Sequence, residues 1–278
     1  TNLSKRDKDL VVMIVKGTLR WRGRIDWILD RFLHQGMESL SPWARNTLRM
    51  GAYQILYLDR VPPHAATHES VRLASRYGHA AIAGLVNAVL RRICEEDRDA
   101  LLSGPEGDDT AALSVRYSHP EWIVDRWIAT WGLEETKAIM EADNASRGVT
   151  LRVNTLRTTR EELQEILRVE GVETELGKLS ELTLTAEHDL SPRDQQSFND
   201  GLFTIQDEAE TLVGTLLGAQ PGEVIVDLCA GPGGKSTHIV EATGDNAQVY
   251  AVEPRWPRVR KIRESADRLG FNSLLAVD

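Results

Sequence analysis

Residues 224–235 read VIVDLCAGPGGK, and this stretch decides how the C-terminal part of the chain folds. Residues 224–226 are β-branched and apolar, which predicts a short buried strand. Residues 231–234 form a Gly-Pro-Gly-Gly turn that only small residues can make, and residues 236–242 carry helix formers. A strand, a glycine-rich turn and a helix in this order predict a ligand cradle, because the backbone is bare and the first helical turn has free N–H groups that suit an anion.

The following elements extend this cradle into a parallel sheet. Residues 248–252 form an apolar strand that ends at Glu253, and residues 273–277 form another that ends at Asp278. Residues 256–270 between them predict a helix rich in Arg and Lys. The order β-loop-α-β-α-β is half of a doubly wound sheet, with ligand groups at the carboxyl ends of three strands. An acid at the tip of the second strand is where a ribose diol would be held.

The glycine turn differs from two common nucleotide motifs. No glycine lies five residues before Gly234-Lys235-Ser236, so the turn is not GxxxxGK[ST], and it is not GxGxxG. The CAGPGGK core, the Asp227-Leu228 lead-in and the spacing to Glu253 instead resemble S-adenosylmethionine-dependent RNA (cytosine-C5) methyltransferases. The chain departs from that family at Gly231, where Ala is common, and at Glu253, where Asp is common. A Rossmann-like half that binds another nucleotide, or none, is the alternative.

The resemblance implies which residues would contact the cofactor, S-adenosyl-L-methionine. Glu253 would hold the ribose and Asp278 the adenine edge. Lys235 could meet the cofactor carboxylate or face solvent. The residues that would line the methionine end are Cys229, Ala230, Gly231, Pro232, Gly233, Gly234 and Lys235.

The resemblance also implies the chemistry. In that family one cysteine thiolate adds to C6 of cytosine, C5 then attacks the methyl group, and a second cysteine assists release. Both cysteines lie after the third strand, so we expect them beyond Asp278 and assign no catalytic residue within this chain. Cys94 would end an N-terminal helix, and Cys229 would have a packing role in the cofactor loop. We expect the chain alone to bind cofactor weakly or not at all and not to turn over, and the full-length protein to be the enzyme.

Residues 3–98 read as helices throughout. Ser41-Pro42 predicts a helix start, and apolar residues between Ile82 and Ile93 recur at helical steps. The segments 17–24, 48–58 and 84–92 resemble the NusB-type RNA-binding helical domain, in the form fused to bacterial small-subunit ribosomal-RNA methyltransferases. Trp21 and its neighbouring arginines could contact RNA, but a packed Trp21 beneath surface arginines is the better interpretation.

The middle of the chain predicts a small α/β module that, by the same resemblance, would help to hold RNA. Thr158 or Thr159 with Glu161 or Glu162 predicts a capping box. Residues 122, 127 and 131 are tryptophans at helical steps, and we expect them to pack in a core. Near the cradle, Gln206 and Asp207 could shape the cofactor pocket, although Asp207 as a helix N-cap is the simpler interpretation.

We therefore predict a multidomain fold. It comprises an all-α NusB-like domain at 1–100, a polar, turn-rich linker at 101–112, a small α/β RNA-binding domain at 113–200, and the N-terminal part of a Rossmann-like methyltransferase domain at 201–278. The last strand has no partner along the sequence, from which we expect the chain to be a fragment. The predicted function is formation of 5-methylcytosine in 16S ribosomal RNA. The alternative is a non-enzymatic NusB-like RNA-binding or transcription antitermination factor.

Composition and charge limit which cellular compartment and which kinds of binding partner we expect. Hydrophobic residues make up 41% and charged residues 27%, as in soluble globular proteins, with no membrane-length apolar run and no signal peptide. Two distant cysteines form neither a disulfide framework nor a metal site and fit a cytoplasmic protein, which we expect to be a monomer. Residues 1–100 hold 16 Lys and Arg against 11 Asp and Glu, whereas the rest holds 17 against 31. The basic front permits contact with small-subunit ribosomal RNA, and a solvated surface explains it equally well.

Overall fold

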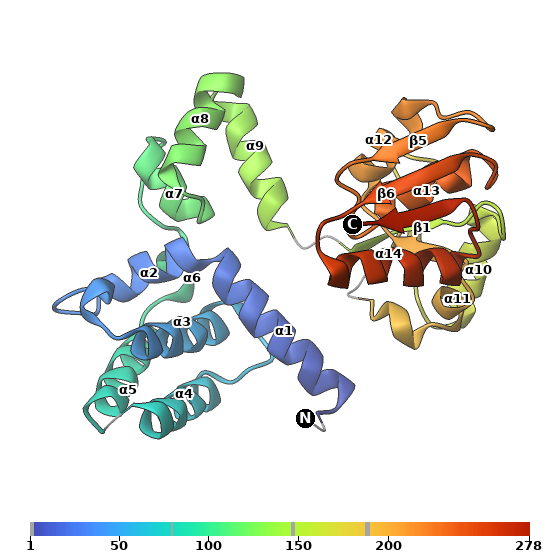
Figure 1. Cartoon of the computed structure of the whole chain (residues 1–278). Coiled ribbons are helices and arrows are strands. Elements are labelled where there is room, and N and C mark those ends of the chain that lie inside the picture. The colour runs from blue at the N-terminus through green and yellow to red at the C-terminus, as the bar shows by residue number, and fades with distance from the viewer. Residues whose placement is uncertain (1–2, 79, 146–147, 187–189) are drawn as a thin grey trace. The chain divides into compact units, whose positions relative to one another are not determined.

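The computed structural model describes residues 3–78, 80–145, 148–186 and 190–278. It divides into two compact units, residues 1–145 and residues 146–278 (Figure 1), and each is described by itself. The limits of these two units do not coincide with the predicted domain boundaries at residues 100, 112 and 200. Those domain boundaries stay a prediction. No described helix is long and apolar enough to cross a membrane.

The N-terminal unit is entirely helical in its described residues. Its larger part packs around α3, which Ser41 caps through the backbone N–H of Ala44 and which starts with proline, as predicted. Leu48, Leu56 and Leu90 are fully buried in this core. The helices are α1 (Lys5–Arg20), α2 (Arg22–Asp30), α3 (Pro42–Tyr57), α4 (Pro63–Tyr77), α5 (Ala80–Glu95), α6 (Arg98–Leu102), α7 (Thr110–Tyr117), α8 (Glu121–Trp131) and α9 (Leu133–Asn144), with a 3-10 turn at Met37–Ser39.

Several tryptophans of this unit lie differently from the prediction. Trp21 is packed, as expected: it stacks on Tyr57 with ring centroids 5.2 Å apart. Core packing is wrong for Trp122 and Trp131, which are 65% and 51% exposed, whereas Trp127 packs partly against the small core of α7–α9. The spacing of these residues predicts a helix, but the number of neighbouring elements decides which of its side chains are covered.

The C-terminal unit begins with a four-stranded antiparallel sheet of order β2-β3-β1-β4. Its strands are β1 (Val149–Val153), β2 (Thr174–Leu176), β3 (Thr183–Ala186) and β4 (Phe203–Ile205). Leu151 lies opposite Leu184 and Val153 opposite Phe203, and all four are buried. Helix α10 (Arg160–Val169) starts with the predicted capping box between Thr159 and Glu162. A 3-10 turn (Pro192–Asp194) and α11 (Gln196–Asn199) precede β4.

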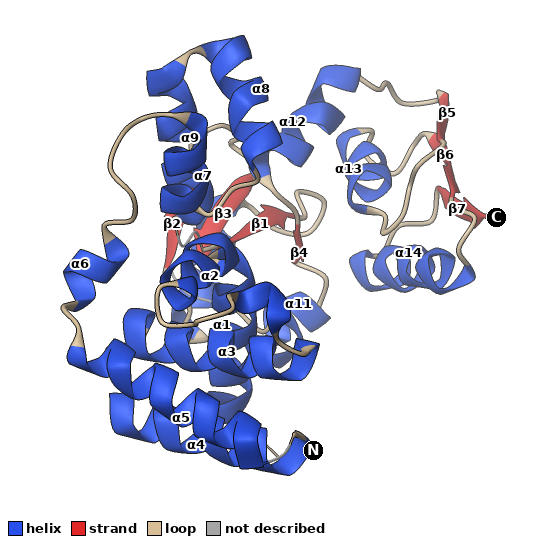
Figure 2. Cartoon of the chain, turned by 90° about the vertical axis from the view of Figure 1, so that its left-hand side faces the viewer, coloured by secondary structure: helices blue, strands red, loops and turns tan. Residues whose placement is uncertain are grey.

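A second, parallel sheet of order β5-β6-β7 follows. It consists of β5 (Val224–Asp227), β6 (Gln248–Val252) and β7 (Leu274–Val277), with α12 (Glu208–Leu217), α13 (Gly234–Ala242) and α14 (Trp256–Leu269). Figure 2 shows α13 and α14 on the same side of the three strands. Val249 and Ala251 of β6 are buried in the core that these two helices share with the sheet.

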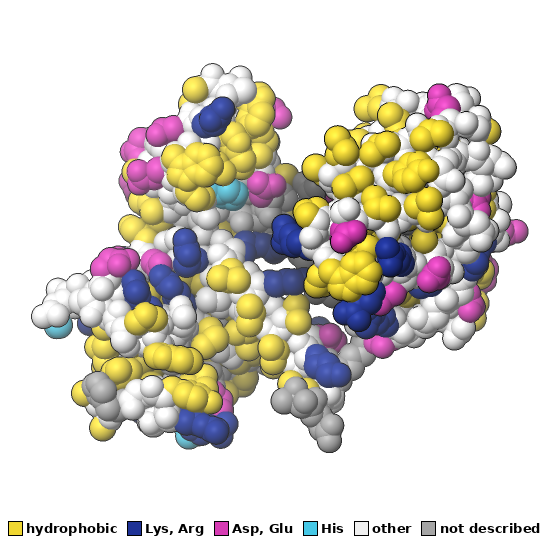
Figure 3. All heavy atoms as spheres, viewed as in Figure 1, with side chains coloured by type: hydrophobic (Ala, Val, Ile, Leu, Met, Phe, Trp, Pro, Cys, Tyr) yellow, Lys and Arg dark blue, Asp and Glu magenta, His cyan; other side chains and the backbone are white. Residues whose placement is uncertain are grey.

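The other face of this parallel sheet is open. Val224 and Val226 are 70% and 55% exposed, so the prediction of a buried strand at 224–226 is wrong. Strand β5 lies at the edge of the sheet, and its outward side chains have no layer above them among the described residues. Figure 3 shows apolar side chains gathered over these strands.

Candidate functional site

The candidate site is the turn between β5 and α13. Asp227, the last residue of β5, holds both ends of this turn with one carboxylate: Oδ1 accepts the backbone N–H of Cys229 at 3.2 Å, and Oδ2 accepts the Ser236 hydroxyl at 2.7 Å. The sequence analysis assigned no role to Ser236. The sequence feature that indicates this contact is an acidic residue before the glycine-rich turn and a hydroxyl residue after it.

The backbone of the turn lies against the neighbouring strand. Ala230 donates its N–H to the carbonyl of Val252 in β6, and Gly233 donates to the carbonyl of Ala230. Gly233 has φ +111°, a conformation that favours glycine, and it is the N-cap of α13. Because this cap has no side chain, no side-chain oxygen of the described residues caps the N–H groups of the first helical turn. The turn therefore presents bare backbone and a helix N-terminus, as predicted.

Glu253 meets the glycine turn from the end of β6. It is 5% exposed, and its Oε1 accepts the backbone N–H of Arg255 at 3.0 Å. A Cβ built on Gly231 would lie 1.9 Å from Oε2, so this glycine leaves the room that the carboxylate fills. Oε2 lies 3.6 Å from Arg258 Nη1 and accepts no hydrogen bond from the described residues.

The remaining predicted residues lie in different surroundings. Lys235 is exposed, with Nζ 3.5 Å from Glu210 Oε1 of α12. The packing role expected for Cys229 is wrong, because the side chain is exposed. Asp278 is exposed directly after β7. Cys94 is exposed in the N-terminal unit, and no group of three metal-ligating side chains occurs among the described residues.

One hollow of about 660 Å³ adjoins the turn. Every residue from 229 to 235 lines it, together with residues of β4, α11 and α14. Glu253 and Asp278 are not among the residues that line it. The turn therefore separates two places: the acid at the end of β6, and a hollow that extends toward the antiparallel sheet.

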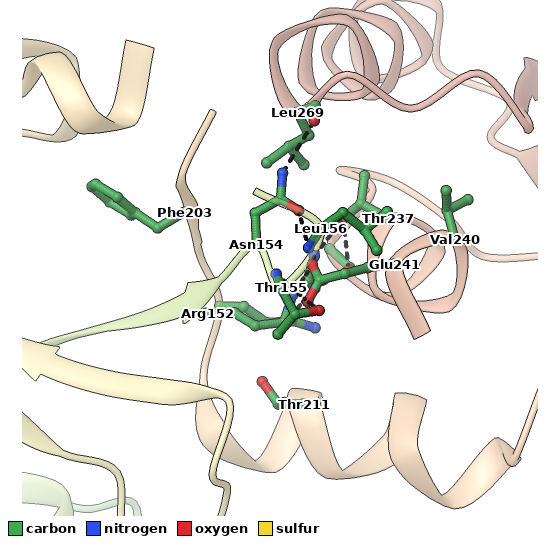
Figure 4. A network of polar contacts seen from close by, with 12 residues as sticks. Arg152, Asn154, Thr155, Leu156, Phe203, Thr211, Thr237, Val240, Glu241 and Leu269 are labelled. Atoms are coloured by element: carbon green, nitrogen blue, oxygen red, sulfur yellow. Dashed lines mark hydrogen bonds and ion pairs between the residues drawn. The ribbon is translucent and has the colours of Figure 1, made fainter. Parts of the chain in front are cut away.

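A buried ion pair ties that antiparallel sheet to α13. Arg152 of β1 is fully buried, with Nη2 3.2 Å and Nε 3.3 Å from Glu241 Oε2 (Figure 4). Arg152 also donates to the carbonyl of Gly234 at 2.9 Å and to Gln206. Burial lowers the pKa of Arg152 and raises the pKa of Glu241, and the attraction between the two opposes both shifts.

The sequence analysis missed Arg152 and Glu241. The available signal was one arginine inside a mostly apolar strand, 89 residues from its partner. Gln206 is buried in the same network, and its Nε2 has no acceptor among the described residues. Asp207 caps α12 through the N–H of Ala209, which confirms the simpler of its two interpretations.

Three family models match consecutive segments of the chain. The NusB family matches residues 1–95, the ferredoxin-like domain of RsmF/B-type methyltransferases matches residues 119–190, and 16S rRNA methyltransferase RsmB/F matches residues 214–278. In this order the three segments resemble the domains of RsmB/F-type methyltransferases. The ferredoxin-like match includes α8 and α9, which the compact units group with the N-terminal helices.

Relatives of the RsmB type align over nearly the whole chain. The probable ribosomal RNA small subunit methyltransferase B of Bacillus subtilis is 34% identical over 99% of this chain, and that of Pseudomonas syringae pv. tomato is 33% identical over 98%. The chain spans about 60% of the length of these relatives.

Two solved structures show the same fold. The crystal structure of PH0851 superimposes with a TM-score of 0.80 at 24% identity, over 99% of this chain and 61% of that one. NSun6 from Pyrococcus horikoshii with SFG gives a TM-score of 0.52 at 18% identity, over 57% of this chain and 65% of that one. At these identities the likeness is one of fold alone.

Proposed function

We propose that this chain is the RNA-holding and donor-binding part of an enzyme that forms 5-methylcytosine in 16S ribosomal RNA with S-adenosyl-L-methionine as methyl donor. One observation carries the proposal: within the segment matched to RsmB/F, the glycine turn and the Glu253 carboxylate meet at the carboxyl ends of two neighbouring parallel strands. In doubly wound sheets this edge is where nucleoside ligands bind.

The residues present fit the donor. Glu253 Oε2 has no hydrogen-bond donor among the described residues, and a ribose hydroxyl would supply one. The bare backbone of residues 229–234 and the free N–H groups at the start of α13 suit the methionine end and its carboxylate. Lys235 would complete this end by leaving Glu210, and Asp278 would contact the adenine edge.

The donor supplies an electrophilic methyl group on sulfonium sulfur. The chain's own residues would bind and orient it, and the nucleophilic cysteine is expected beyond residue 278. We further propose that the partner is small-subunit ribosomal RNA, whose target base must be unstacked to be reached. We also propose that the protein is a cytoplasmic monomer.

A non-enzymatic NusB-like RNA-binding or antitermination factor is the rival function. It accounts for residues 1–95 and leaves the glycine turn and Glu253 without a role. The relatives reported above carry methyltransferase names, and no comparison favours the rival.

The test is binding of radiolabelled S-adenosyl-L-methionine by equilibrium dialysis to the full-length protein, together with methyl transfer to 16S ribosomal RNA. Glu253→Ala should weaken donor binding roughly ten- to a hundredfold, because about 1.5–3 kcal/mol of charge-assisted hydrogen bonding is lost. Glu175→Ala, an exposed glutamate of β2, is the matched control and should leave affinity unchanged. Unchanged affinity in Glu253→Ala would refute the ribose role, and the absence of any donor binding would favour the rival function.

A further inference from the structure

The hollow beside the glycine turn extends beyond the residues proposed to hold the donor. Most of its wall comes from the turn at 229–235, one face of α14, and the segment from the 3-10 turn at Pro192–Asp194 to β4. Glu210 of α12 and Thr237 of α13 complete it. Its volume of about 660 Å³ exceeds what one small anion fills, and Glu253 does not line it.

Cationic side chains outnumber acids in this hollow. Arg193, Lys235, Lys261 and Arg268 line it, against Glu210 and Glu264. Glu210 pairs with Lys235. None of the other three cations has a carboxylate within ion-pair distance in the described ranges of the chain. Among the described residues that line the hollow, three cations therefore stand against one acid outside an ion pair, Glu264, and leave a net positive charge.

Arg268 is held in place with part of its guanidinium unused. It lies over the ring of Phe198, 3.7 Å from the centroid, and Nη1 donates to the carbonyls of Phe198 and Phe203 at 2.6 and 2.9 Å. Nε and Nη2 have no acceptor among residues 3–78, 80–145, 148–186 and 190–278. Burial, and then the nearby Arg157, lower the pKa of Arg268 to about 10, so it stays charged at neutral pH.

We propose that this hollow binds the phosphate backbone of a single RNA strand, with Arg268 as the fixed contact and with Arg193 and Lys261 as mobile ones. A planar guanidinium with free N–H groups matches phosphate oxygens. Arg193 lies on the 3-10 turn at Pro192–Asp194, and Lys261 and Arg268 lie seven residues apart on α14. Three cations spaced in this way suit successive phosphates better than one isolated anion. The proposal rests on the proposed function in taking RNA as the substrate, because a strand bound here would pass beside the glycine turn.

The test compares two neighbouring charge reversals on α14. Lys261 lines the hollow, whereas Arg260 is exposed and lines none of the described hollows, so Lys261→Glu and Arg260→Glu make the same charge reversal at two places. Binding of a fluorescently labelled single-stranded RNA of mixed sequence to the full-length protein is measured at several salt concentrations. Lys261→Glu combined with Arg193→Glu should weaken binding by roughly tenfold or more and reduce the salt slope by about 0.7 for each lost contact. Arg260→Glu should change the affinity less than Lys261→Glu alone. Equal losses in these two single variants would overturn the proposal.

Two further measurements are needed. One distinguishes binding of RNA in the hollow from binding of the methyl donor, and the other distinguishes RNA phosphate from free phosphate as the ligand. Binding of S-adenosyl-L-methionine to Lys261→Glu should equal that of the unaltered protein; loss of donor binding with RNA binding intact would show that these cations serve the donor. Inorganic phosphate should compete only weakly; binding of phosphate that Lys261→Glu abolishes, without effect on RNA, would make this a free-phosphate site. If the protein binds no donor but Lys261→Glu still weakens RNA binding, the RNA site stands and the proposed function fails.

Discussion

Gly231 and Glu253 share one small volume at the candidate site. The missing side chain of Gly231 leaves the space that Glu253 Oε2 fills, so each residue limits the size of the other. In the family that the glycine turn resembles, we expect Ala and Asp at these positions, one methyl larger and one methylene shorter. We therefore expect the two departures noted in the sequence to compensate each other.

This compensation is testable with a double-mutant cycle. Gly231→Ala alone should cost about 1–3 kcal/mol of stability, because the new methyl group overlaps the Glu253 carboxylate. Adding Glu253→Asp should restore at least about half of that loss, with a coupling energy of roughly 0.5–3 kcal/mol. Urea unfolding of the two single variants and the double variant measures it, and additive losses would show that the residues do not compete for space.

His238 makes the C-terminal unit sensitive to acid. The ring is buried, and burial together with the positive charge of Arg152 lowers its pKa from 6.5 to about 4. The folded state therefore holds the neutral ring, whereas the unfolded chain takes up a proton near pH 6.5. The contribution of His238 to the free energy of unfolding is fully present above pH 6.5. It is lost as the pH falls toward 4, by about 3 kcal/mol in total.

We expect His238→Gln to flatten that pH dependence. The free energy of unfolding of the unaltered protein should fall between pH 6.5 and 4 more steeply than that of the variant. His119→Gln, at a partly exposed histidine of the N-terminal unit, is the control and should keep the steeper fall. Parallel pH profiles for His238→Gln and the unaltered protein would contradict the role of His238.

At the scale of elements, one buried ion pair joins β1 to the helix that begins at the glycine turn. Arg152 reaches Glu241 and the carbonyl of Gly234, so a strand of the antiparallel sheet holds both the first residue of α13 and its last turn. Neither charge is exposed to solvent, and the pair is thus costly to break from one side.

Arg152→Met should destabilise the protein by about 3–5 kcal/mol, because it leaves Glu241 buried without a partner. In this variant the pKa of Glu241 should rise further, so the loss should be smaller near pH 5, where the carboxyl takes up a proton, than near pH 8. Arg152→Met combined with Glu241→Leu should recover at least about half of the loss. Urea unfolding at both pH values measures this, and equal costs for the single and double variants would rule out the coupling.

At the scale of the whole molecule, the two compact units should unfold separately. Of the seven tryptophans, only Trp256 lies in the C-terminal unit, so tryptophan fluorescence reports mainly on residues 1–145. Arg152→Met should therefore leave the main fluorescence transition in urea unchanged and shift a second transition seen by circular dichroism. A single transition that moves as a whole with both probes would show that the units unfold together.

Local signals in the sequence determined the element boundaries. The Ser41 cap with its proline, the Thr159–Glu162 capping box and the strand-turn-helix at 224–242 lie where they were predicted, because caps and turns depend on residues a few positions apart. The meeting of the glycine turn with Glu253 was also predictable, since successive parallel strands bring their carboxyl ends to one edge. What these residues bind stays a proposal.

Only the tertiary structure decided what is buried. Val224 and Val226 carry a core-like sequence but lie on an open sheet face, and Trp122 and Trp131 lie at opposite ends of α8 and both stay exposed. Arg152, by composition a surface residue, is fully buried because Glu241, 89 positions away, compensates its charge. Burial depends on which distant elements pack together, and this information is carried by contacts between distant residues and not by any single segment of the sequence.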